Sequence, residues 1–310
     1  MEFFKIKKDI PFMSYGKLTT TISLVTFILS IFFLVHKGLN LSVEFTGGTL
    51  LEISYKNSIN PNLVREKLEK NGFHDAIVQN YGTSNSIIVR IAEKNSFTNN
   101  TNISTQVFDL IKNIEIGGEL KSVEFIGPEV GQDLITNGLL AILFVCIGII
   151  CYLAIRFEWR FAIAAILANM HDVIIILGVF ALFQFEFSLT VLAAILAVLG
   201  YSVNESVVVF DRIRENFRSS TLETVPDIIN NAITATLSRT IITHGCTEMM
   251  VLSMFFFGGP SLHNFAIALT IGIIFGIYSS VLVASPLVMW FGISKNNLVK
   301  KKVNKEEVII

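Results

Sequence analysis

The sequence predicts a polytopic α-helical membrane protein, with six transmembrane helices and one small external α+β domain of the ferredoxin-like type. Two observations lead to this fold class. Hydrophobic residues make up 52% of the 310 residues and charged residues only 16%, which is too apolar for a soluble chain to bury in one core. Between the first two apolar runs lies a long segment, 38–133, in which short alternating runs and helical patterns follow one another.

Six apolar runs reach the roughly 20 residues that a helix needs to cross a bilayer. They are Leu18–Val35, Leu134–Ala154, Phe161–Phe183, Ser188–Phe210, Arg239–Phe257 and Phe265–Phe291. We therefore expect an amino-terminal stretch 1–17, a first helix 18–35, the external domain 38–133, a five-helix bundle 134–293 and a basic tail 294–310. The first run is longer than a typical signal core and no small-x-small site follows it, so it is predicted to remain as an anchor.

The distribution of basic residues predicts that both termini are cytoplasmic. Lysines and arginines gather in 1–17, between the second and third runs, after the fourth run and in the tail. The short loops 184–187 and 258–264 on the opposite side carry none. Segment 38–133 is thus expected to lie outside.

This external segment has the element order β-α-β-β-α-β, which is the ferredoxin-like pattern. Strands are predicted at Thr49–Tyr55, Ala76–Tyr81, Ser86–Ala92 and Leu120–Ile126, and helices at Pro61–Asn71 and Thr98–Asn113. Some nucleic-acid-binding modules share this order. The segment is acidic, however, and lacks clustered exposed aromatic residues on a central strand, so no nucleic-acid partner is expected.

A further helix is predicted at the inner face, near 222–237. Its apolar residues fall at helical spacing against Asp227, Asn230 and Asn231, which is typical of an amphipathic helix lying on a membrane surface. The alternative is an ordinary capped connector between the fourth and fifth spans.

Glu205 is the residue most indicative of function, because it lies inside the fourth apolar run. A carboxylate in hydrocarbon costs several kcal/mol and is seldom found there without a partner or a task.

The sequence does not indicate a disulfide scaffold, a metal site or a nucleotide-binding site. The three cysteines lie in apolar runs, which argues against a disulfide scaffold and a zinc site. Gly47-Gly48 lacks the Lys-Ser/Thr of a phosphate-binding loop.

Seven short motifs occur in order along the chain. They are Val43–Gly48, Phe125–Leu134, Arg156–Phe161, His171–Asp172, Gly200–Asn216, Leu237–Thr240 and Phe257–Gly259. Their residues include Gly47, Gly48, Gly127, Pro128, Asp211 and Arg212. On this evidence the chain resembles the SecD/SecF family of protein-export membrane subunits, within the resistance-nodulation-division superfamily.

The resemblance implies a multi-pass subunit of the bacterial cytoplasmic (inner) membrane that works with SecD. Its other implied partners are the Sec translocation channel with its accessory subunits, and unfolded preprotein on the external side. The implied activity is late translocation driven by the proton motive force, not an enzymatic reaction. No cofactor is implied, and protons, or sodium ions in their place, would be the coupling ion. Two alternatives stay open: a half-length exporter of lipid or small molecules, and a purely structural subunit that stabilises SecD.

The resemblance also implies a functional carboxylate on the fourth span and a functional arginine on the fifth. Here these are Glu205, where relatives usually have Asp, and Arg239. At about 1.5 Å per residue, Glu205 lies roughly 8 Å inside the cytoplasmic edge, and Arg239 at that edge can reach inward. The two side chains are therefore expected to meet, as a switchable pair or, alternatively, as a static bridge. Asn204 is an auxiliary candidate.

Further polar residues within the spans are candidates. Asp172, near the middle of the third span, is a secondary proton-path candidate. His171 beside it is expected to form a hydrogen-bonding contact with a neighbouring helix instead, since adjacent helical residues do not face each other. His244 and Glu248 are four apart and share a face of the fifth span. They are predicted to satisfy each other as a buried pair, and the alternative is that they supplement the proton path.

Overall fold

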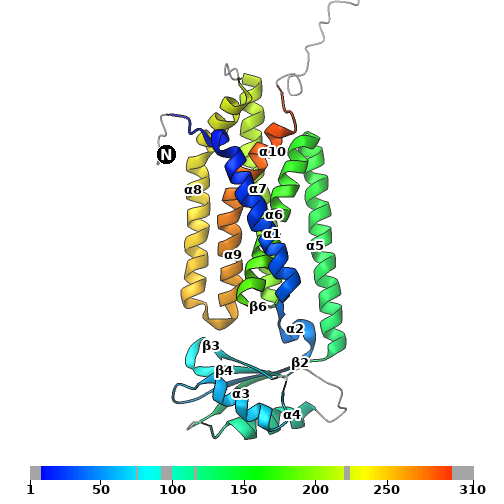
Figure 1. Cartoon of the computed structure of the whole chain (residues 1–310), viewed down its shortest axis with the longest axis vertical. Coiled ribbons are helices and arrows are strands. Elements are labelled where there is room, and N and C mark those ends of the chain that lie inside the picture. Colours follow the sequence, from blue (N-terminus) through cyan, green and yellow to red (C-terminus); the bar gives the residue numbers. More distant parts are fainter. Residues whose placement is uncertain (1–7, 75, 92–99, 115–116, 220–223, 295–310) are drawn as a thin grey trace, which may run out of the picture.

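The computed structural model describes residues 8–74, 76–91, 100–114, 117–219 and 224–294. Within them, six helical segments are long and apolar enough to cross a membrane, as predicted. They stand side by side above a small α/β domain (Figure 1). The helices are α1 Gly16–Lys37, α5 Pro128–Arg156, α6 Trp159–Phe183, α7 Leu189–Ser219, α8 Val225–Phe257 and α9 Gly259–Ser279; a 3₁₀ turn, Phe12–Tyr15, precedes α1.

The last span is interrupted near its end, where α9 passes through a π-helical turn, Ser280–Ala284, into α10, Ser285–Trp290. The cause is Pro286, which has no N–H to donate to the carbonyl four residues earlier, that of Leu282. The Thr19 hydroxyl on α1 lies 3.2 Å from this carbonyl and donates to it. Pro286 thus leaves the Leu282 carbonyl without its helical donor, and Thr19 of α1 supplies one instead.

The prediction of a separate helix on the inner face is wrong. Residues 222 and 223 lie outside the described part of the chain, and from Val225 the backbone is one continuous helix to Phe257. Its apolar face packs on the bundle rather than on lipid, because Ile228, Ile229 and Ile233 are all buried in the core that α6 and α7 share. The Thr224 hydroxyl caps the helix start by accepting from the Asp227 N–H.

The external domain is the predicted ferredoxin-like fold. Its strands are β2 Gly48–Ser54, β3 Ile77–Tyr81, β4 Thr83–Ile91 and β5 Glu119–Ile126, and its helices are α3 Pro61–Lys70 and α4 Asn100–Ile111. The strands form one antiparallel sheet in the order β3-β4-β2-β5. Both helices cover the face turned away from the bundle (Figure 1), and the core between them and the sheet includes Leu51, Ile53, Leu68 and Ile87.

The Gly47-Gly48 motif forms the joint between the first span and this domain. A short helix, α2 Val43–Thr46, ends there, and both glycines have positive φ angles, 71° and 130°, which favour glycine. The N-terminal turn of α5 packs closely on this joint: a Cβ at Gly131 would lie 2.7 Å from the Phe45 carbonyl oxygen. Gly127 precedes α5 and Pro128 opens it. The backbone thus requires glycine at 47 and 48, whereas a Cβ at Gly127 would have nothing within 4 Å.

At the end of the bundle nearest the external domain, a two-stranded parallel sheet joins the segment after α1 to the connection between α6 and α7. β1, Asn40–Leu41, follows α1, and β6, Glu186–Phe187, lies in the connection between α6 and α7.

Small residues bring helices together elsewhere in the bundle. A Cβ at Gly178 of α6 would lie 2.3 Å from Ser30 of α1, and one at Gly272 of α9 would lie 2.2 Å from Val198 of α7.

Candidate functional site

Two carboxylates lie inside the helical bundle, as the sequence predicts. Asp172, near the middle of α6, is 1% exposed, and Glu205, near the middle of α7, is 6% exposed. α7 continues past the predicted span end at Phe210 to Ser219, so Glu205 is a mid-helix residue. Since α6 and α7 are the most buried of the spanning helices, both carboxylates face protein rather than lipid.

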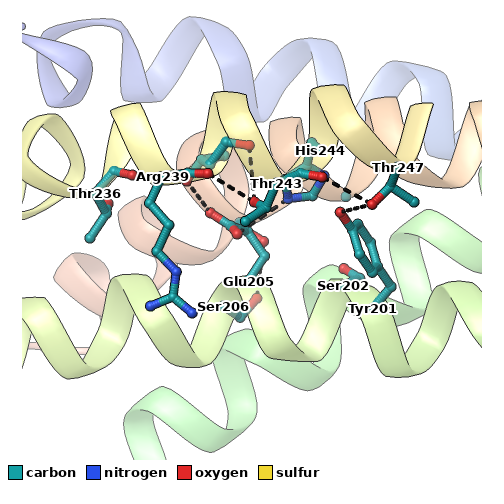
Figure 2. Close-up of polar contacts among 12 residues, drawn as sticks. Tyr201, Ser202, Glu205, Ser206, Thr236, Arg239, Thr243, His244 and Thr247 are labelled. Carbon is teal, nitrogen blue, oxygen red and sulfur yellow. Dashed lines mark hydrogen bonds and ion pairs between the residues drawn. The ribbon is translucent and has the colours of Figure 1, made fainter. Parts of the chain in front are cut away.

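Glu205 is held by two residues of α8. The Thr240 hydroxyl donates to Glu205 Oε1 at 2.5 Å, and His244 Nε2 lies 3.2 Å from Glu205 Oε2. Figure 2 shows the His244 side chain pointing from α8 toward Glu205 on α7. Thr240 and His244 are four residues apart and so lie on one face of α8. Each oxygen of the buried carboxylate thus has a hydrogen-bond partner on α8.

Arg239 does not meet Glu205, contrary to the prediction. It precedes Thr240 by one residue, and one residue turns a helix by about 100°, so Arg239 is exposed whereas Thr240 is buried. Figure 2 shows its side chain extending from α8 toward α7 to one side of Glu205. Within the part of the chain that the structure describes, Arg239 has no ion pair. It lines an open pocket at the end of the bundle away from the external domain.

This basic pocket has a volume of about 550 Å³ and is lined by α5, α7 and α8. Its charged residues are Arg156, Asp211, Arg212, Arg214, Glu215, Arg218 and Arg239. The motif residues Asp211 and Arg212 act here as ion-pair partners, of Arg156 at 2.5 Å and of Glu215 at 2.7 Å respectively. Thr236 also lines the pocket, and its carbonyl accepts from the Thr240 hydroxyl at 3.2 Å. The pocket therefore reaches Thr236, one helical turn before Thr240, whose hydroxyl donates to Glu205.

The predicted His244–Glu248 pair is also wrong. His244 faces Glu205, and its ring packs edge-on against the Tyr201 ring at a centroid distance of 4.8 Å. Glu248 is partly buried, and its Oε2 atom has no hydrogen-bond partner among the described residues. The two side chains share a helix face by spacing, but the buried neighbour that His244 finds is a carboxylate on another helix.

Asp172 has partners on three helices. The hydroxyls of Ser202 on α7 and Ser279 on α9 donate to its Oδ2 at 2.8 and 2.7 Å. His171 Nδ1 lies 3.2 Å from Oδ1, so the expectation that these adjacent residues diverge is wrong: the ring reaches back although the Cβ atoms diverge. The expected hydrogen bond of His171 to a neighbouring helix is also wrong: among the described residues its Nε2 atom has no partner, and the ring contacts other helices by stacking on Phe27 and Tyr278.

Hydroxyl groups line the seam between the two carboxylates. Ser202, which donates to Asp172, precedes Glu205 by three residues on α7, and Ser206 follows it directly. The Ser206 and Ser280 hydroxyls are 3.1 Å apart, and Ser280 is next to Ser279 on the last span. All four serines are buried, at 0 or 1% exposure. The structure thus brings Asp172 and Glu205 into one polar seam within the bundle.

Asn204 does not belong to this seam, because it is exposed on the outer face of α7. The residues that sequence reasoning missed are the hydroxyls, above all Ser202, Thr240 and Ser279. A signal for Thr240 is present in the chain: Thr236, Thr240 and His244 recur at four-residue spacing, which marks one polar helix face. Among the described residues, no cluster of His, Cys, Asp and Glu could hold a metal ion.

Comparison with known proteins identifies the family. Residues 106–294 match the family described as "Protein export membrane protein SecD/SecF, C-terminal", and residues 32–59 match the "SecD/SecF GG Motif". The Protein translocase subunit SecF of Vibrio alginolyticus is 43% identical over 98% of this chain and 97% of its own length. That of Escherichia coli O157:H7 is 38% identical over 97% and 93%.

Solved structures agree with this result. The crystal structure of SecDF from Thermus thermophilus, described as a translocon-associated membrane protein, superposes with a TM-score of 0.82 at 32% identity. SecDF in its super-membrane-facing form gives 0.70, also at 32% identity. The match covers 93% and 95% of this chain, but only 39% and 40% of the SecDF chains, which are much longer. The chain therefore belongs to the SecD/SecF family of protein-export membrane proteins, and within it to the SecF subunits.

Proposed function

We propose that this SecF subunit works with SecD to promote late preprotein translocation, and that protonation and deprotonation of Glu205 couple this work to the proton motive force. The observation that carries the proposal is the contact of a buried carboxylate on α7 with His244 and Thr240 on α8. In this arrangement a single proton changes the bonding between two helices.

The chemistry of the switch follows from the geometry. An ionised carboxylate accepts hydrogen bonds at both oxygens, whereas a protonated one must donate from one of them. A proton on Glu205 Oε2 would therefore require His244 Nε2 to accept instead of donate. One on Oε1 would require the Thr240 hydroxyl to accept from it and to donate only to the Thr236 carbonyl. Burial makes each such change costly to leave uncompensated, so α7 and α8 would shift relative to each other.

In this proposal protons reach Glu205 through the basic pocket at one end of the bundle. The basic pocket reaches Thr236, whose carbonyl accepts from Thr240. Asp172 is the second proton-path group, connected to α7 through Ser202. Arg239 keeps a role in this proposal as a pocket residue near the entrance, where a fixed positive charge influences which ions approach.

The other parts of the proposal come from the relatives. The partners would be SecD, the Sec channel with its accessory subunits, and unfolded preprotein at the external domain. The energy would come from an ion gradient of protons, or of sodium ions in their place, and not from nucleotide hydrolysis or a cofactor. The half-length exporter alternative has no support, since the chain matches SecF subunits over nearly their full length.

The test is export of a preprotein into inverted membrane vesicles under an imposed proton gradient or an imposed sodium gradient. Glu205→Gln should abolish the gradient-dependent part while the complex with SecD still assembles, and Glu205→Asp should retain most of it. Asn204→Ala is the matched control, because Asn204 adjoins Glu205 but faces outward. Normal gradient-dependent export by an assembled Glu205→Gln complex would instead favour the purely structural role, in which Glu205 only ties α7 to α8.

A further inference from the structure

Arg90 is a charged side chain buried where the external domain meets the bundle. It lies on β4, between Leu50 of β2 and Ile77 of β3, and is only 4% exposed. A guanidinium group stays protonated under all ordinary conditions. Burying it is therefore unfavourable unless a carboxylate compensates the charge.

The compensating carboxylate belongs to the other part of the molecule. Arg90 forms an ion pair with Glu186, which lies on β6 between α6 and α7. None of its three guanidinium nitrogens makes a hydrogen bond among the described residues, so the ion pair with Glu186 is its direct charge contact there. Burial lowers the pKa of Arg90, and the charges of Glu186 and then Glu44 oppose that effect. Both carboxylates thus offset part of the cost of burying the cation.

Glu186 and Glu44 are in turn fixed to the bundle. β6 pairs with β1, and Asn264 at the start of α9 donates from Nδ2 to the Glu186 carbonyl at 3.2 Å. Glu44 Oε2 accepts from the Leu189 N–H, the first of α7, at 2.6 Å. Glu186 and Glu44 are therefore both attached to the connection between α6 and α7. These are the helices that carry Asp172 and Glu205.

The rest of the contact between the sheet and the bundle is sparse. The Tyr81 and Ser261 hydroxyls are 2.9 Å apart at its edge. Between them and the joint lies a cavity of about 210 Å³, lined by polar groups of both parts, including Glu52, Glu124 and Ser188. Leu50 and Ile88 of the sheet also line this cavity, so the sheet and the bundle are not packed directly against each other there.

We infer that Arg90 is a positioning residue whose ion pair with Glu186 holds the sheet of the external domain on the α6–α7 connection, so that displacements of α6 and α7 are carried to the external domain. The attachment stands on the geometry alone. Its use in export rests on the proposed function.

The attachment can be measured as a distance between two spin labels, one at Lys70→Cys on α3 and one at Phe257→Cys at the end of α8. Both positions are exposed. The three natural cysteines are replaced by serine, and the labelled chain is studied with SecD in lipid nanodiscs. The variants are Arg90→Gln, Glu186→Gln and the reversed pair Arg90→Glu with Glu186→Arg. Lys121→Gln is the matched control, since it removes the exposed Lys121–Glu119 pair of the same domain.

We expect one narrow distance distribution for the unsubstituted chain and for Lys121→Gln. Arg90→Gln and Glu186→Gln should each broaden it, and the reversed pair should be narrower than either. Glu186→Gln keeps the test decisive if Arg90→Gln fails to fold, because Glu186 lies outside the external domain. A narrow, unshifted distribution for Glu186→Gln would overturn the attachment.

Gradient-driven export by the same variants tests the coupling. Glu186→Gln should lower the rate several-fold, with recovery in the reversed pair. A broadened distribution with unchanged export would overturn the coupling. Failure of the proposed function would look different: Glu205→Gln would then export normally, whereas the distance distributions of the Arg90 and Glu186 variants would still report on the attachment.

Discussion

Glu205 depends on His244 and not on Glu248, and substitutions can separate the two. His244→Ala removes the partner of Glu205 Oε2 and leaves a buried acceptor unsatisfied, which costs about 1–3 kcal/mol. We expect lower membrane levels and slower gradient-driven export for His244→Ala. Glu248→Leu should be close to the unsubstituted chain, because Glu248 contacts neither His244 nor Glu205 through a hydrogen bond.

The double variant decides between the two pairings. His244→Ala with Glu248→Leu should be as defective as His244→Ala alone. If the double instead regained normal levels and export, His244 and Glu248 would be partners of each other in the membrane. His244→Gln, which keeps a donor at this position, serves as the conservative control.

Tyr55 offers a test of the external domain by pH. It is 2% exposed, its hydroxyl donates to the Ile111 carbonyl at 3.0 Å, and burial raises its pKa to about 12. An unfolded tyrosine has a pKa of about 10. The raised value means that Tyr55 contributes its stability in full below about pH 10 and loses it as the pH rises through about 12. In an absorbance titration of tyrosinate in the whole protein, Tyr55→Phe should remove a late-titrating group; an unchanged alkaline limb would contradict this assignment.

At the scale of elements, helix positions were predictable and helix rotations were not. Hydropathy located all six spans, because a bilayer fixes their length and composition. Which side chain of α8 meets Glu205 depends on rotation, and a shift of one residue turns the helix by about 100°. Arg239 was expected at the start of a span that in fact begins at Val225. The continuous helix then directs Thr240 and His244, not Arg239, to the buried face.

Close helix contact at Gly272 can be tested with matched glycine substitutions. A Cβ at Gly272 would lie 2.2 Å from Val198, whereas one at Gly148 of α5 would have nothing within 4 Å. Gly272→Ala should therefore lower the thermal unfolding temperature in detergent, in line with the 1–3 kcal/mol that overpacking typically costs. Gly148→Ala should leave that temperature unchanged or raise it, because alanine is the better helix former. Equal shifts for both variants would show that α7 and α9 can separate at little cost.

At the scale of the whole molecule, the separate parts were more predictable than their junction. The external domain follows from local patterns, with alternation for each strand and boundary residues such as Pro61 for helices. The junction is built from contacts far apart in the chain: the Asn40–Glu186 strand pairing, the Glu44–Leu189 cap and the Arg90–Glu186 ion pair. Two-residue strands and single ion pairs leave no periodic pattern in a sequence.

The orientation of the whole molecule gives the last prediction. The described amino-terminal residues and α10 lie at the same end of the bundle, opposite the external domain (Figure 1). The basic pocket with Arg156 and Arg218 lies at that end too, and positive residues favour the cytoplasmic side. In spheroplasts of a chain with its natural cysteines replaced, Lys70→Cys on the external domain should react with a membrane-impermeant maleimide. Lys8→Cys should react only after permeabilisation, and the chain without cysteine gives the background. Labelling of Lys8→Cys in intact spheroplasts would invert the orientation, and the basic pocket would then open to the outside, where protons enter along the gradient.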